Sequence, residues 1–167
     1  MSAPDEAERP SLVRVWLVRS TITGLGAATS LAVASLLAMP EAYWAAVTTI
    51  IVLQSTLGAE WTVSKQRLVG TFVGAACGGA LTTAVGQPGV VVFGLAIFAL
   101  GPLCGLLGLE RNAYRFAGVT LGTVALVARP TTPFVIASHR FVEVSLGIVV
   151  ALVLTAVWPA PELDDAR

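Results

Sequence analysis

The sequence predicts an all-α integral membrane protein with six transmembrane helices, and its composition is the first reason. Of the 167 residues, 56% are hydrophobic and only 12% are charged, whereas a soluble domain carries about 25% charged residues. The mean hydropathy is +0.83. The second reason is that apolar runs long enough to cross much of a ~30 Å hydrocarbon core recur between short polar or proline-containing breaks.

The first three expected spans follow a polar tail over residues 1–11, which we expect to lie at the surface. A proline turn separates the first two spans, and a polar linker precedes the third. The expected spans are Val15–Met39, Tyr43–Leu57 and Arg67–Val85, with the turn at Met39–Glu41 and the linker at Gly58–Gln66.

The last three expected spans are separated by a tight Gly-Gln-Pro-Gly turn, a short charged break and a proline-punctuated loop. The spans cover about Val90–Leu109, Ala113–Ala128 and Arg140–Trp158, and the breaks are Gly86–Gly89, Glu110–Asn112 and Arg129–His139. Residues 12–159 would form the transmembrane domain, which leaves no room for a soluble domain within it. An acidic tail over residues 160–167 follows.

Positively charged residues near the span ends predict the orientation, because they accumulate on the cytoplasmic side. With the N-terminus inside, eight lie on the cytoplasmic side, and only Arg129 and Arg140 lie outside. We therefore expect a multi-pass protein of the plasma (inner) membrane with both termini in the cytoplasm. The eight are Arg9, Arg14, Arg19, Lys65, Arg67, Arg111, Arg115 and Arg167.

A stripe of small residues marks the third span. Gly70, Gly74 and Gly78 recur every fourth residue and so share one side of a helix. In lipid, such a stripe lets another helix approach closely, because packing holds membrane bundles together. Cys77 and Cys104 also fall within apolar runs, where we expect packing residues rather than a disulfide or metal pair.

Three arginines are the strongest candidates for binding a ligand. Arg67, Arg115 and Arg140 are expected at the N-terminal ends of spans, where guanidinium charge and helix dipole add. Arginine binds a carboxylate through two parallel hydrogen bonds. Two alternatives stay open: Arg67 and Arg115 as flanking charges that extend to the interface, and Arg140 paired internally with Glu143, one helical turn away.

Polar and aromatic side chains near these arginines are further candidates for the binding site. Thr71 lies beside the glycine stripe together with Arg67. Gln54 lies among apolar neighbours, where it would hydrogen-bond to another helix or contact an anion. Tyr43 and Trp44 begin the second span and would form an interfacial aromatic belt or a stacking surface for an aromatic substrate.

Two titratable residues are candidates for proton coupling. Glu143 is an ionisable group inside a span, and such groups are by default functional candidates. His139 is the only histidine, and its ordinary pKa near working pH suits a proton relay. The other interpretations are an internal ion pair for Glu143 and an interfacial position for His139.

Similar segments recur in the two halves of the chain. Residues 67–74 (RLVGTFVG) resemble residues 140–147 (RFVEVSLG), and residues 42–46 (AYWAA) resemble residues 113–117 (AYRFA). A repeat of three spans would give two halves of opposite topology, as in many transporters. The alternative is chance similarity between segments rich in alanine, valine and glycine.

These segments carry a family resemblance. The order YWAAVT (43–48), VLQ (52–54) and RLVGTFVG (67–74) resembles the core of the fusaric acid resistance family, which includes aromatic acid exporters and is related to the plant aluminium-activated malate transporters. The closing Arg140, Glu143, Gly147 and Trp158-Pro159 are similar to the last span of that membrane domain. The resemblance implies six helices that export organic anions, typically aromatic carboxylates, and assemble as a dimer or larger unit.

The residues and the resemblance together favour a membrane transporter or channel for organic anions. The alternative is a non-transporting membrane subunit that scaffolds a larger efflux assembly. No nucleophile–base pair or metal-ligand spacing is apparent, so we expect neither an enzyme nor a cofactor or metal. The expected partners are the lipid bilayer, a small organic anion and a second copy in a homodimer or higher homo-oligomer, with no nucleic acid.

Overall fold

The computed structural model describes residues 9–53, 59–127 and 132–158. These ranges contain six α-helices and no strand, as the sequence predicts. The helices are α1 (Arg9–Leu36), α2 (Tyr43–Leu53), α3 (Glu60–Val85), α4 (Val90–Leu106), α5 (Arg111–Leu126) and α6 (Pro133–Val157).

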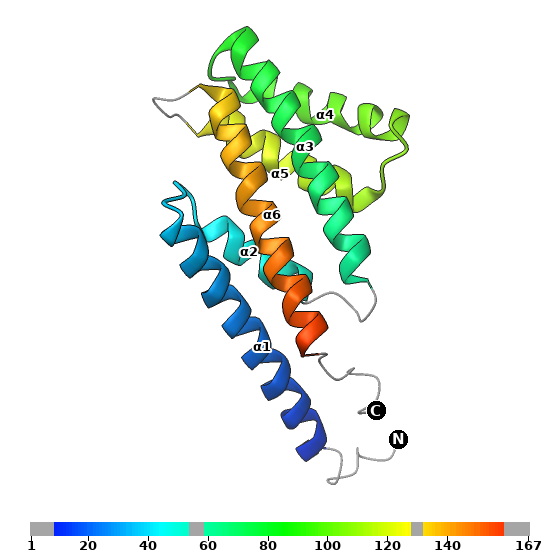
Figure 1. The fold of residues 1–167 in the computed structure, drawn as a ribbon. Coiled ribbons are helices and arrows are strands. Elements are labelled where there is room, and N and C mark those ends of the chain that lie inside the picture. Colours follow the sequence, from blue (N-terminus) through cyan, green and yellow to red (C-terminus); the bar gives the residue numbers. More distant parts are fainter. Residues whose placement is uncertain (1–8, 54–58, 128–131, 159–167) are drawn as a thin grey trace, which may run out of the picture.

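The three long helices α1, α3 and α6 give the molecule its length (Figure 1). Helices α3 and α6 run in opposite directions and pack side by side, with α6 between α3 and α1 (Figure 1). The short helix α2 contacts α1 and α6, whereas α5 packs mainly on α3 and α4 packs on α5. The polar residues that line α2, α3, α5 and α6 are thereby brought to one region of the interior.

Three helices are long and apolar enough to cross a membrane within the described residues, at Val13–Leu36, Glu60–Val85 and Pro133–Val157. Helix α2 has 11 residues, so it rises only about 16 Å. Helices α4 and α5 have 17 and 16 residues, or about 25 Å. The described residues therefore give three full-length spans and three shorter helices, and they do not confirm the expected count of six.

Three helices begin six or seven residues earlier than the sequence pattern indicates. Helix α1 begins at Arg9 and takes in the last residues of the predicted tail, α3 begins at Glu60 inside the predicted linker, and α6 begins at Pro133 inside the predicted loop. Proline suits the first turn of a helix, because its fixed φ is helical and its missing N–H would have no partner there. Pro133 therefore marks the start of α6. The predicted tail over residues 160–167 lies outside the described residues.

The glycine stripe forms the contact between α3 and α5. A Cβ built on Gly70 would overlap the carbonyl oxygen of Ala113, and one built on Gly74 would overlap that of Ala117. At Gly78 the nearest atom would be the Cβ of Val124, at 3.0 Å. The absence of side chains thus lets the two backbones approach, as the sequence predicts for a small-residue stripe.

A second close helix contact joins α6 to α2. A Cβ on Gly147 would overlap the carbonyl oxygen of Ala45. The hydroxyl of Thr49 donates to the carbonyl oxygen of Gly147 at 3.0 Å and also to that of Ala45 at 3.0 Å. Each half of the chain therefore places one glycine-bearing helix against a short helix of the other half.

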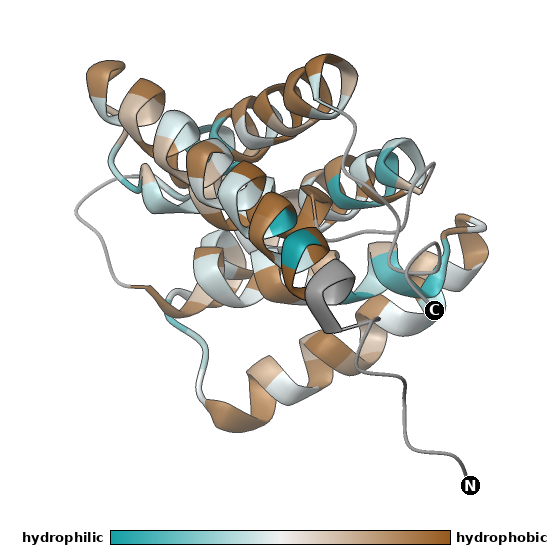
Figure 2. Ribbon diagram, turned by 90° about the horizontal axis from the view of Figure 1, so that it is seen from below, coloured by the Kyte–Doolittle hydropathy of each residue, from teal (hydrophilic) through white to brown (hydrophobic). Residues whose placement is uncertain are grey.

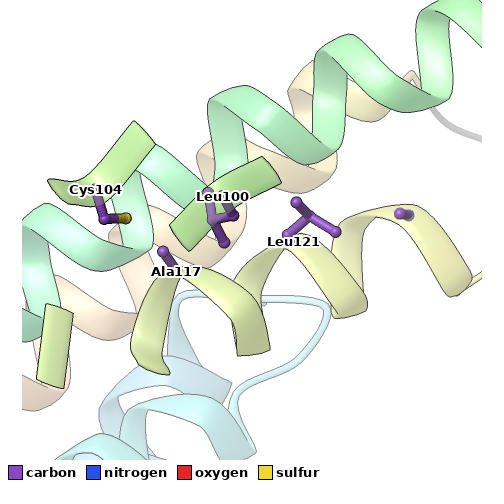
Figure 3. Close-up of a cluster of buried hydrophobic side chains, with 5 residues drawn as sticks. Leu100, Cys104, Ala117 and Leu121 are labelled. Atoms are coloured by element: carbon purple, nitrogen blue, oxygen red, sulfur yellow. The ribbon is translucent and has the colours of Figure 1, made fainter. Parts of the chain in front are cut away.

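Apolar clusters also join these helices. In one cluster, α4 packs on α5 through Leu100, Cys104, Ala117 and Leu121 (Figure 3), with Cys77 of α3 packed against it. Both cysteines thus serve as packing residues. The other cluster joins α2 to α6 through Val52, Val144, Ile148 and Ala151.

The outer surface is strongly apolar. Most of the ribbon has hydrophobic or neutral colours, and hydrophilic residues are confined to a few positions (Figure 2). Many large apolar side chains are exposed, including Phe72, Phe98 and Phe134. Phe72, Phe134 and Phe141 also line an apolar groove of about 450 Å³ between α3 and α6. Such a surface suits lipid, which is as apolar as these side chains.

Candidate functional site

A buried polar cluster lies where α2, α3, α5 and α6 meet, and it surrounds a small cavity. Two arginines of the sequence prediction, Arg67 and Arg140, reach this cavity from opposite halves of the chain. The cavity volume is about 10 Å³, which is room for one water-sized guest. Its lining residues are Trp44, Arg67, Thr71, Phe116, Val119, Thr120, Thr123, Arg140 and Val144.

Arg67 lies inside the protein, with only 4% of its surface exposed. Its Nε donates to the hydroxyl of Thr48 at 3.0 Å, and its guanidinium lies over the ring of Phe116, 4.8 Å from the centroid. No carboxylate of the described residues comes within 4 Å of it. Arg67 is therefore neither a flanking charge that extends to the interface nor half of an ion pair in this part of the chain.

Arg140 is equally buried but is matched by two carboxylates. It forms an ion pair with Glu41, from the α1–α2 turn, and a second with Glu143, whose Oε2 lies 3.5 Å away. Glu143 is 1% exposed and accepts a hydrogen bond from the backbone N–H of Glu41 at 3.0 Å. The internal pair predicted for Arg140 and Glu143 is thus confirmed, and Glu41 completes it.

The helix-dipole argument for these two arginines is wrong. Each is the eighth residue of its helix, because α3 begins at Glu60 and α6 at Pro133. The dipole's influence falls off within the first turn. The sequence prediction assigns Arg67 and Arg140 to opposite sides of the membrane, and the structure places both in the lining of one interior cavity.

Aromatic rings cover both guanidinium groups. Arg140 lies 4.3 Å from the ring centroid of Trp44, which gives a cation–π contact like that between Arg67 and Phe116. The indole nitrogen of Trp44 is buried and has no hydrogen-bond partner among the described residues. Trp44 is partly buried and lines the cavity, whereas Tyr43, beside it, is about half exposed.

The other predicted site residues divide into two groups. Thr71 is 2% exposed and lines the cavity, as predicted for a residue beside Arg67. Arg115 and His139 are exposed and do not line the cavity. Gln54 lies outside the described residues.

Three contact partners of the two arginines are absent from the sequence prediction. Glu41 was assigned to a turn, although its position before the aromatic pair at the start of α2 could have indicated a capping or pairing role. Thr48 lies in the segment 43–48 and Phe116 in the segment 113–117, but no local pattern marks either residue as a partner of Arg67. Their roles follow only from the packing of α3 against α2 and α5.

Comparison with protein-family models gives the decisive observation. A model described as fusaric acid resistance protein-like matches residues 25–154, which include Arg67, Arg140 and the cavity between them. The chain belongs to this fusaric acid resistance protein-like family. The family and the apolar helices identify it as a membrane protein related to transport. No curated protein and no solved structure matches the chain.

Proposed function

We propose that this member of the family moves organic anions across the plasma membrane, as a transporter or a channel, and exports aromatic carboxylates. The observation that carries the proposal is the state of Arg67, a buried cation without a carboxylate within 4 Å among the described residues. A buried charge is costly unless it is paired. A substrate carboxylate would supply the missing partner through the guanidinium fork.

The surroundings of Arg67 suit the rest of an aromatic acid. The rings of Phe116 and Trp44 line the cavity with the arginine, and aromatic pairs favour offset or edge-to-face contact. Thr71 adds a hydroxyl group on the α3 side. A cavity of about 10 Å³ does not hold an aromatic ring, so transport requires α3 and α6 to separate from α2 and α5. The structure then corresponds to a closed state.

The contacts of the two arginines support a repeat of opposite topology. Arg67 contacts the ring of Phe116, and Arg140 contacts the ring of Trp44, so a shift of about 72 residues exchanges the two contacts. The same shift exchanges the close contact of Gly74 with Ala117 and that of Gly147 with Ala45. This register differs by one from the alignment of Tyr43 with Tyr114. In transporters built from inverted repeats, the substrate site lies between the halves, which is where the cavity lies. The same plan has all six helices crossing the bilayer, with both termini in the cytoplasm.

The test is anion flux in liposomes that contain the purified protein alone. A panel of aromatic and dicarboxylic acids should give saturable flux, and Arg67→Met should abolish it while the protein stays folded and inserted. Arg111→Met, which removes an exposed arginine, is the matched control. Flux that depends on a pH gradient would indicate a coupled transporter, and ohmic currents would indicate a channel. Undiminished flux in Arg67→Met would contradict the proposal.

The apolar groove favours a second candidate function, a membrane subunit that scaffolds a larger efflux assembly. Phe72, Phe134 and Phe141 line about 450 Å³ of unfilled apolar space between α3 and α6. A helix of another protein, or of a second copy in a homo-oligomer, would fill such a groove by packing. The same liposomes separate the two functions, because a scaffold gives no flux without its partners.

A further inference from the structure

We propose that the cavity beside Arg67 is a binding site for a small monovalent inorganic anion, of which chloride is the representative. The anion would occupy the site in the closed state, and an organic carboxylate would displace it. This inference rests on the same cation as the proposed function. It differs in the ligand, since it concerns a single ion and not the transported acid.

The lining of the cavity supplies hydrogen-bond donors and positive charge. Arg67 is only 4% exposed, and among the described residues its guanidinium donates one hydrogen bond, from Nε–H to the hydroxyl of Thr48. The buried indole N–H of Trp44 has no partner among the described residues. A buried donor that stays unpaired loses its hydrogen bonds to water and gains none in return, which is unfavourable. An acceptor in this cavity would relieve that cost.

The carboxylates of the cluster are committed elsewhere. Glu41 and Glu143 both pair with Arg140, and Glu143 also accepts the backbone N–H of Glu41. Within the described part of this cluster, Arg67 is the charge without a carboxylate in direct contact. A negative guest is therefore favoured over a neutral water molecule, because burial strengthens its attraction to the guanidinium.

The size of the cavity selects among anions. A volume of about 10 Å³ accepts one water-sized particle. A halide ion is larger than water but far smaller than gluconate or an aromatic acid, so it requires the least widening of the cavity. The rest of the lining is made of the apolar side chains Phe116, Val119 and Val144 and the threonines Thr71, Thr120 and Thr123. The apolar share suits a weakly hydrated monovalent ion and disfavours a multiply charged one.

The experiment measures the melting temperature of the full-length protein in detergent at constant ionic strength, with chloride replacing gluconate. The wild type should show a saturable rise with chloride, and with bromide, because a ligand that binds the folded state stabilises it by mass action. Arg111→Met should keep this rise. A melting temperature that does not change with the halide concentration would overturn the proposal.

Two variants locate the bound ion. Arg67→Met should weaken the apparent halide affinity at least about tenfold, because a charge-assisted hydrogen bond is lost. Trp44→Phe keeps a ring over Arg140 but removes the indole N–H, and it should weaken the affinity by about fivefold. If Arg67→Met does not fold, the halide titrations of the wild type and of Trp44→Phe still test the proposal. Halide affinity unchanged in Trp44→Phe, or in a folded Arg67→Met, would place the ion elsewhere and overturn the proposal.

The same titrations, repeated with benzoate, separate this inference from the proposed function. Benzoate stabilisation without halide stabilisation would overturn the halide site and leave the proposed function standing. Halide stabilisation with neither benzoate stabilisation nor flux of any acid in the panel would support the halide site and contradict the proposed function. If both ligands stabilise the wild type, chloride should raise the apparent dissociation constant for benzoate, and additive effects would overturn the shared site.

Discussion

Arg67 and Arg140 occupy corresponding places in the molecule, yet their surroundings differ in one decisive respect. Each is the eighth residue of a long helix, is at most 4% exposed and lies under an aromatic ring from a short helix of the other half. Arg140 is matched by Glu41 and Glu143, whereas Arg67 has only a hydroxyl partner among the described residues. The comparison separates an arginine whose charge is balanced inside the protein from one whose charge is not balanced by any carboxylate of the described residues.

The difference arises from two positions. Within the repeat register, Glu143 corresponds to Gly70, and Glu41 corresponds to Ala113. The backbones of α3 and α5 meet at Gly70 and Ala113. At the corresponding positions of the other half, Glu143 and Glu41 carry carboxylates. The carboxylates present beside Arg140 are thus replaced by close helix packing beside Arg67. A substrate carboxylate would restore the charge balance that Glu41 and Glu143 provide in the other half.

The largest effect is expected from Glu143→Ala. This change removes one carboxylate from buried Arg140 and leaves the backbone N–H of Glu41 without its acceptor. Breaking a buried ion pair on one side costs about 3–5 kcal/mol, which unfolding titrations in mixed micelles would measure. The double variant Arg140→Met/Glu143→Leu should lose less than the single one. A Glu143→Ala protein as stable as the wild type would show that Arg140 does not depend on this pair.

A smaller loss is expected from Gly74→Val. The added side chain would overlap the carbonyl oxygen of Ala117 and push α5 away from α3, at a cost of about 1–3 kcal/mol. Gly94→Val is the matched control, because a Cβ at that position of α4 meets no atom within 4 Å. Equal melting temperatures for the two variants would contradict the close packing that takes the place of carboxylates beside Arg67.

The smallest effect is expected from Arg115→Met. This arginine is exposed and does not line the cavity, so stability should change by less than about 0.5 kcal/mol. Anion flux should also match the wild type within about twofold, because the screened charge of an exposed group contributes little. A loss of flux as large as that expected for Arg67→Met would show that Arg115 takes part in anion transport.

The sequence predicted the helical class, the family and the glycine contact, because each depends on a local pattern. Hydrophobic runs identify helices, and Gly70, Gly74 and Gly78 lie on one face whatever that face contacts. The sequence predicts Arg67 and Arg140 at helix N-termini, but each is the eighth residue of its helix and is buried. It also predicts a linker that contains Glu60 and Lys65, but both residues lie in the first two turns of α3.

The pairing of the cluster could not be predicted, because it depends on contacts between distant segments. Glu41 and Arg140 are 99 residues apart, and Thr48 reaches Arg67 only because α2 crosses beside α3. For the same reason, the sequence does not predict that carboxylates pair with Arg140 and that none of the described carboxylates pairs with Arg67. One sequence pattern, an arginine followed by a glycine seven residues later, accompanies both a matched and an unmatched charge.

The most direct test of the account compares Arg67→Met with the wild type in one measurement, the melting temperature with and without a saturating aromatic acid. Without ligand, Arg67→Met should be as stable as the wild type or more so, because it removes a buried charge that has no carboxylate partner among the described residues. With ligand, the wild type should gain stability and the variant should not. A variant that melts well below the wild type, yet keeps the ligand-dependent rise, would show that Arg67 supports the fold and does not bind the anion.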